Sequence, residues 1–117
     1  MTSNRALKRW YNKINSRFFY DELPRNVIVR WATPDDDEQD MASVDLAHDK
    51  RHKYEILINR EKNPTLSVEL NSLIHEMCHI ATSLKDDHGA AFEKWRQTLG
   101  ERGIFKKGAL KRGLTIF

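Results

Sequence analysis

The segment LIHEMCHIATSLKDDHG, residues 73–89, carries three histidines and a glutamate at spacings that suit metal chemistry. His75 and His79 are four residues apart, so on a helix their side chains leave the same face one turn apart. Two imidazole nitrogens in this arrangement can bind one zinc ion at about 2.0 to 2.1 Å. Glu76 follows His75 directly, so its carboxylate borders the metal without occupying a ligand position. This HExxH pattern predicts a zinc site in which Glu76 is the general base that takes a proton from water.

A catalytic zinc site needs a third protein ligand and keeps its fourth position open. His88 is the preferred candidate, because the SLKDD turn at 83–87 can fold the chain back toward the two helical histidines. Gly89 would allow a close approach of the backbone at that point. The alternative ligands are Asp86, Asp87, Glu93, His48 and His52.

Several groups could support the chemistry, and the sequence does not choose among them. Asp86, Asp87 and backbone carbonyls are candidates for holding the second ring nitrogens of the histidine ligands. Tyr11, Tyr20 and Tyr54 are candidates for stabilising the oxyanion that forms when a peptide carbonyl is attacked.

The composition restricts the chain to a small single-domain protein. It has 117 residues, enough for one core but too few for two. Its one cysteine, Cys78, cannot form an internal disulfide or a zinc ribbon, so histidines and carboxylates must hold any metal. No apolar run approaches the roughly 18 residues of a membrane span, and no secretory signal is visible. We therefore expect a cytoplasmic protein.

A helix and three short strands are predicted before the histidine motif. Apolar residues repeat at helical spacing from Leu7 to Phe18, and Ser3 or Asn4 can cap this helix. The runs RNVIVRWAT, MASVDLA and KYEILIN predict strands at 25–33, 41–47 and 53–59. The last two strands are expected to form a hairpin in which Ala42, Val44 and Leu46 face Tyr54, Ile56 and Ile58.

Two further helices are predicted, one on each side of the SLKDD turn. A long helix capped by Thr65 or Ser67 has a broad apolar face, which places it in the core. A second helix, capped by Asp86 or Asp87, ends near Gly100. The expected fold class is α+β: an N-terminal helix, a small and mainly antiparallel three-stranded sheet, the long HExxH helix and a following helix, in a zincin-like arrangement.

Basic residues concentrate near both ends of the chain. The N-terminal helix carries Arg5, Arg9, Lys13 and Arg17 at intervals of four, and residues 100–117 hold five basic residues against one acid. Such segments can contact the phosphates of DNA. The alternative function is therefore a nucleic-acid-binding module in which zinc only stabilises the fold.

Five segments together resemble the SprT-like family of zinc metallopeptidases. They are WYNKINSRFFYDELP, VIVRW, ILIN, LNSLIHEMCH and HGAAF. HExxH alone occurs in many unrelated peptidases, whereas its combination with a downstream HGxxF and an upstream NxxFFxxxLP pattern is much more specific. The chain lacks the cysteine zinc ribbon of some members, so the resemblance is to a minimal core domain, residues 1–100, followed by a short basic tail, residues 101–117.

The resemblance implies a zinc-dependent endopeptidase with His75, His79 and His88 as ligands and Glu76 as the catalytic base. It also implies protein substrates, including proteins bound to DNA, because family members cleave DNA–protein crosslinks. A chain with only the core domain is expected in a bacterial cell or a phage-infected host.

Overall fold

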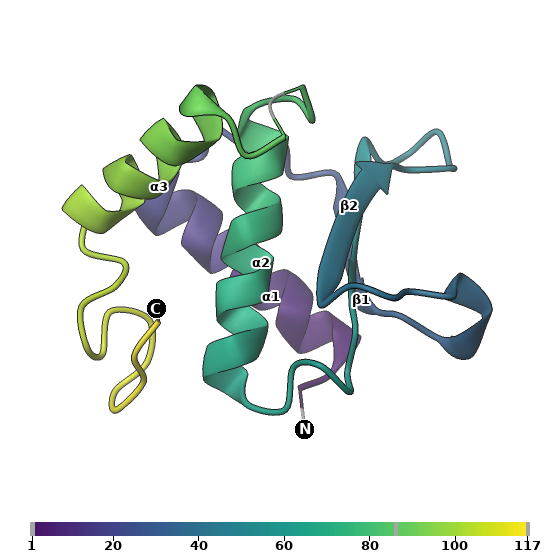
Figure 1. The fold of residues 1–117 in the computed structure, drawn as a ribbon, viewed down its shortest axis with the longest axis horizontal. Helices are drawn as coiled ribbons and strands as arrows, with labels where there is room; N and C mark the ends of the chain where they lie inside the picture. The colour runs from purple at the N-terminus through teal and green to yellow at the C-terminus, as the bar shows by residue number, and fades with distance from the viewer. Residues whose placement is uncertain (1, 86, 117) are drawn as a thin grey trace.

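Figure 1 shows the computed structural model of the protein, which describes residues 2–85 and 87–116. Three α-helices and a three-stranded sheet make up the fold, so the predicted α+β class is confirmed. Along the chain these elements are α1 (Asn4–Phe18), β1 (Val27–Trp31), β2 (Ala42–Leu46), β3 (Tyr54–Ile58), α2 (Leu66–Ala81) and α3 (Ala90–Glu101), with a 3-10 turn at Pro34–Asp36.

The sheet has the strand order β1-β3-β2, with β3 in the middle. β2 pairs antiparallel with β3 in the predicted hairpin register, which places Ala42 opposite Ile58 and Val44 opposite Ile56. β1 runs parallel to β3, so the expected mainly antiparallel sheet is in fact a mixed sheet. β3 runs opposite to β2 and in the same direction as β1. Because it lies between them, it forms an antiparallel pair with β2 and a parallel pair with β1.

Local sequence determines where the first two helices begin. The Ser3 side chain caps α1 by accepting a hydrogen bond from the Ala6 amide, and the Thr65 side chain caps α2 by accepting one from Val68. The predicted cap of α3 is wrong for Asp87, because Gly89 is the N-cap residue. Asp86, the other predicted cap, lies outside the described residues.

One face of the sheet is buried beneath α1 and α2, which Figure 1 shows on the same side of the strands. Alternate residues of β1 and β3 supply this face and are buried throughout, whereas the matching residues of β2 are half-buried or exposed. Leu46 pairs with Tyr54 as predicted, but it is 62% exposed. The helices therefore cover β1 and β3 fully and leave β2 partly open beside α2.

The basic segment after α3 is folded against the rest of the protein. Ile104, Leu110 and Ile116 are buried in the core. Lys13 and Arg17 of α1 donate hydrogen bonds to the backbone carbonyls of Leu110 and Ala109, each at 2.9 Å. These contacts bring the basic residues of 106–112 beside the basic face of α1. In the part of the chain that the structure describes, no helix has the length and apolar character needed to cross a membrane.

Candidate metal centre

Two of the three predicted histidine ligands lie on an exposed line along the otherwise buried helix α2. Between residues 70 and 80, only Asn71, His75 and His79 are half-exposed, and every other residue is buried. A spacing of four places their side chains on one face of the helix. α2 therefore packs its other faces into the core and presents both histidines, one turn apart, at the protein surface.

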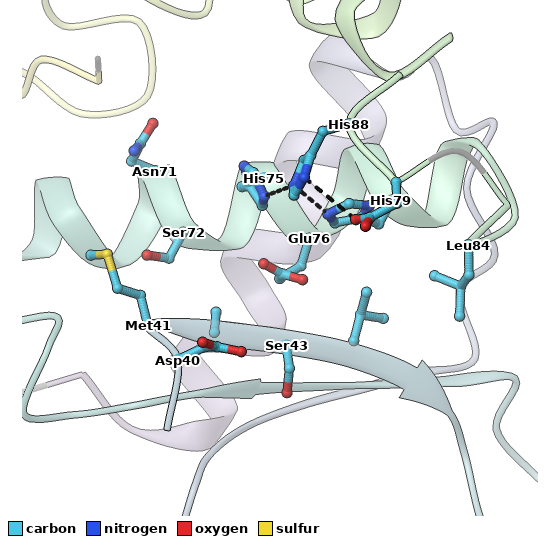
Figure 2. Close-up of a pocket in the computed structure, with 13 residues that line it drawn as sticks. Asp40, Met41, Ser43, Asn71, Ser72, His75, Glu76, His79, Leu84 and His88 are labelled. Atoms are coloured by element: carbon cyan, nitrogen blue, oxygen red, sulfur yellow. Dashed lines mark hydrogen bonds and ion pairs between the residues drawn. The ribbon is translucent and has the colours of Figure 1, made fainter. Parts of the chain in front are cut away.

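His88, which lies just before the Gly89 N-cap of α3, completes the group. Its Nε2 atom lies 2.9 Å from Nε2 of His75 and 3.1 Å from Nε2 of His79, and Figure 2 shows the three rings converging. Two nitrogens bound at about 2.0 to 2.1 Å to one tetrahedral ion are roughly 3.3 Å apart. The three nitrogen atoms thus lie close enough to bind a single metal ion.

The turn that returns the chain to His88 is anchored on His79 itself. At the end of α2 the Leu84 amide donates to the carbonyl of His79, and the Ser83 amide donates to that of Ile80, each at 2.9 Å. This pair of bonds is the Schellman motif, which requires a left-handed residue just after the helix. Ser83 takes that conformation with φ 56° and Leu84 follows with φ 60°.

The backbone at His88 is also left-handed. Its φ is 64°, whereas the neighbouring Gly89 has φ −82°, a value that any residue adopts. The backbone angle at 89 therefore does not itself require a glycine. A non-glycine residue held in the left-handed region costs about 1 to 3 kcal/mol, so the fold accepts strain at the residue that supplies the third imidazole.

Phe92 of α3 forms an apolar support beneath the three imidazole rings. Its ring centroid lies 4.9 Å from that of His75, 4.7 Å from that of His79 and 4.9 Å from that of His88. Phe92 is 2% exposed, so the contacts exclude water from the inner side of the histidines. No role at the site was predicted for Phe92, although the HGxxF spacing was an available signal.

The histidines are electrostatically suited to bind a cation other than a proton. Burial, followed by the nearby His79 and His88 rings, lowers the pKa of His75 to about 4. Burial and His88 also lower the pKa of His79. Both rings are therefore neutral at pH 7, the form that binds metals. Lone pairs that converge at such short distances repel unless a proton or a metal ion lies between them.

Glu76 projects from α2 toward β2, on the side of the helix that faces the strand (Figure 2). It is 6% exposed. Burial, and after it the negative charges of Glu38 and Asp40, raises the pKa of Glu76 to about 7. A carboxyl group with such a pKa can accept and release a proton near neutral pH.

Glu76 and the histidines share a cleft of about 600 Å³ between α2 and β2. β2 is an edge strand, and the Met41 carbonyl and Ala47 amide at its two ends bond to the β3 side. Because antiparallel strands alternate the direction of their backbone groups, Ala42 and Val44 direct theirs to the open edge. Both residues line the cleft.

A buried hydrogen-bond network fixes β2 relative to α2 and so sets the width of the cleft. Ser72 of α2 donates to the Asn63 side-chain oxygen at 2.6 Å. The Asn63 amide in turn donates to the carbonyl of Met41 at 2.8 Å and to that of Asn59 at 2.7 Å. Asn63 and Ser72 are 2% and 6% exposed. This network was not predicted, because nothing in the local sequence pairs Asn63 with these groups.

The remaining predicted alternatives take other positions. Among the described residues, the three histidines form the one group with ligand atoms close enough to share a metal ion. His52 is paired with Asp49 in the β2–β3 loop, and Glu93 with Arg96 on α3. His48 is exposed in the same loop. Asp86 lies outside the described residues.

Asp87 is a partner of the metal-binding group instead of a member of it. Its carboxylate lies 3.4 Å from Nδ1 of His88, the nitrogen that faces away from the other two histidines. The structure describes the tyrosines proposed for the oxyanion, Tyr11, Tyr20 and Tyr54, and none of them lines the cleft. Cys78 is fully buried, as predicted.

Comparison with known protein families, curated proteins and solved structures finds no match to this chain.

Proposed function

We propose that this protein is a zinc-dependent endopeptidase of the SprT-like kind, with a zincin-like active site. The observation that carries the proposal is the convergence of three imidazole Nε2 atoms, 2.9 and 3.1 Å apart, beside a buried glutamate in an open cleft. Three imidazole nitrogen ligands suit zinc, and three protein ligands leave a fourth position free for a reactant.

His75, His79 and His88 would hold the ion. When bound, zinc supplies a lowered pKa for water, to about 7, and polarisation of the scissile carbonyl. Asp87, whose carboxylate lies 3.4 Å from the outer ring nitrogen of His88, would favour the form of that ring in which the outer nitrogen carries the proton and Nε2 faces the metal.

Glu76 performs the proton transfer in this proposal. Its carboxylate enters the cleft next to the histidines and is shielded from bulk solvent. It takes a proton from the attacking water and delivers it to the nitrogen of the departing amine. Within the described residues no hydrogen bond or ion pair holds the Glu76 carboxylate. A buried glutamate without such a partner does not stabilise the fold, which favours a role in the reaction.

The edge of β2 provides a means of aligning a peptide substrate. The backbone groups of Ala42 and Val44 are directed to the open edge and can pair with an extended chain. Such a chain would lie along the cleft between β2 and α2, and its carbonyls would pass the histidines. This arrangement favours unfolded or flexible protein segments as substrates over compact domains.

The decisive experiment combines metal analysis with cleavage of an unstructured protein such as casein. We expect one zinc per chain and cleavage by the wild type. Glu76→Gln should retain zinc and lose cleavage. Glu69→Gln is the matched control, because Glu69 is a buried glutamate on the same helix that bonds Thr2 away from the cleft. Equal activity of Glu76→Gln and wild type would overturn the proposal.

Binding of nucleic acid is the second candidate function, and one structural observation favours it. The bonds from Lys13 and Arg17 to the backbone at Leu110 and Ala109 place two basic segments, distant in sequence, side by side. The combined surface presents more positive charge than either segment alone. The same bonds also occupy Lys13 and Arg17, which leaves Arg5 and Arg9 of α1 and the exposed lysines of 106–111 as the candidate phosphate contacts.

A salt series tests this candidate. Binding of single- and double-stranded DNA should weaken with salt, with a logarithmic slope of about 0.7 to 0.9 for each phosphate contact. Charge reversal of Lys106 and Lys107 should reduce that slope, since both are exposed. If binding is absent, or does not depend on salt, the second function is excluded.

A further inference from the structure

A second, smaller pocket opens beside the histidine line of α2. Its volume is about 230 Å³, roughly that of seven or eight water molecules, which is room for one side chain. It shares Asn71 and His75 with the cleft, so a peptide that reaches the histidines passes its entrance. The complete lining is Asn71, Ile74, His75, Cys78, Arg96 and Phe105.

Asn71 extends the exposed line of α2 by one turn beyond His75. Figure 2 shows its amide pointing away from β2, in contrast to Glu76. Within the described part of the chain, this half-buried amide has no hydrogen-bond partner. A side-chain amide offers two donors and an acceptor. Asn71 therefore presents unused hydrogen-bonding capacity next to the proposed reaction centre.

Arg96 provides a positive charge on the α3 side of the same pocket. Its ion pair with Glu93 has a separation of 3.5 Å, and the two side chains are 50% and 57% exposed. Such exposed pairs contribute little stability, so the guanidinium can exchange this partner for another carboxylate. Ile74 and Cys78 are buried at the wall of the pocket and suit a methylene stem.

The charge of the large cleft has the opposite sign. Asp40, Glu76 and Asp87 line it, and among its described lining residues there is no lysine or arginine. A substrate carboxylate is therefore repelled by the acidic side chains of the cleft, and among the residues that line the two cavities Arg96 of the small pocket is the cationic side chain it can reach. Because the linings of the cleft and the small pocket differ in charge, the two should favour different substrate side chains.

We propose, on the basis of the peptidase function above, that the small pocket is a subsite for an acidic side chain of the substrate. An aspartate or glutamate adjacent to the scissile bond would place its carboxylate between the Arg96 guanidinium and the Asn71 amide. Arginine suits this role because its planar donors match a carboxylate. Arg96 and Asn71 are thus specificity-determining residues.

The test uses a set of peptides that differ at one position, occupied by Glu, Gln, Leu or Lys, scanned on both sides of the cleaved bond. We expect a kcat/KM about tenfold higher for Glu than for Gln at one position, the low end for a hydrogen bond to a charged group. Arg96→Gln should abolish that preference, and Arg96→Glu should reverse it in favour of Lys. Asn71→Ala should reduce the preference several-fold.

Lys94→Gln is the matched control, because it removes one positive charge from an exposed position of the same helix that does not line the pocket. It should keep the Glu preference. A wild type without any Glu preference, or an Arg96→Gln variant that keeps it, would refute the subsite while leaving the peptidase function intact.

Peptide binding to zinc-loaded Glu76→Gln protein separates this proposal from the catalytic one. Fluorescence anisotropy should show tighter binding of the Glu peptide than the Lys peptide, and Arg96→Gln should remove the difference. That result in a wild type that cleaves nothing would support the subsite and overturn the endopeptidase. Equal binding of the two peptides, or no binding of either, would overturn the subsite.

Discussion

Replacing Phe92 with leucine tests whether the apolar support beneath the histidines contributes to metal affinity. The Phe92 ring contacts all three imidazoles at centroid distances between 4.7 and 4.9 Å. Leucine keeps an apolar side chain in the core but lacks the flat ring against which the imidazoles pack. Each histidine ring should then sample more orientations, and the Nε2 atoms should converge less often.

The size of the effect follows from the number of contacts. An aromatic pair is worth about 0.5 to 1.5 kcal/mol beyond its buried area. Three pairs at the lower limit amount to about 1.5 kcal/mol, which corresponds to roughly a tenfold change in Kd. We therefore expect Phe92→Leu to bind zinc about tenfold more weakly. The free energy of unfolding of Phe92→Leu should fall by about 1.5 kcal/mol or less, because leucine keeps most of the apolar volume.

The assay is competition for zinc against a chromogenic chelator, at a temperature where every variant is folded. The absorption spectrum of the cobalt-loaded protein reports the ligand geometry directly and should shift in Phe92→Leu. Leu99→Ala is the control, because Leu99 is fully buried two turns further along α3. That variant should lose about 2 to 5 kcal/mol of stability and keep its zinc affinity.

Two results would refute this reasoning. If Phe92→Leu binds zinc as tightly as the wild type, the ring contacts have no part in positioning the ligands. If Leu99→Ala weakens zinc binding equally, the effect of Phe92→Leu reflects general loss of stability.

Three further predictions concern the structure around the site. Arg30 holds the pKa of Asp36 well below its usual range. The stabilisation by this pair should therefore be present above about pH 4 and be lost as the pH falls toward the pKa of Asp36 in the folded protein. The unfolding free energies of wild type and Asp36→Asn, measured in urea, should become equal in acid. Burial raises the pKa of Cys78 to about 12, and a thiol reagent at pH 8 should therefore react only after unfolding. Asn63→Ala should cost about 1 to 3 kcal/mol in unfolding free energy, because it leaves the buried Ser72 hydroxyl without its acceptor and removes one of the two donors to the Met41 carbonyl, which keeps only the Asn59 amide. It should also raise KM by loosening β2.

The parts of this fold that were predicted correctly depend on short-range chemistry. The caps of α1 and α2 follow from one hydroxyl group each, at Ser3 and Thr65. The exposed line with His75 and His79 follows from the helical period alone. The hairpin register of β2 and β3 follows from alternating side chains, which one-residue slippage would turn to the wrong face.

The parts that were not predicted depend on contacts between distant segments. The position of β3 between β1 and β2 cannot be read from strand periodicity, which is the same for parallel and antiparallel pairs. The network from Ser72 through Asn63 to Met41 joins three separate segments. The folding of the basic segment 102–116 onto α1 depends on buried apolar residues that are thinly spread, such as Ile104 and Leu110.

The position of His88 was predicted from the sequence, but it depends on both a local turn and a contact with the core. Together they explain how a short stretch of chain completes the three-histidine group. In the Schellman turn the His79 carbonyl accepts a hydrogen bond from the Leu84 amide. The backbone of one proposed ligand therefore fixes the start of the turn that leads to another, His88. Ser83 and Leu84 reverse the chain within two residues through left-handed angles. The remaining short link needs only to reach Phe92, whose ring receives all three imidazoles. Because the turn is tied to α2 at one end and to the core at the other, α2, this turn and α3 set the geometry of the group without a direct bond to β2. A substrate or a substitution that moves β2 should therefore change binding in the cleft while the three nitrogen atoms stay together.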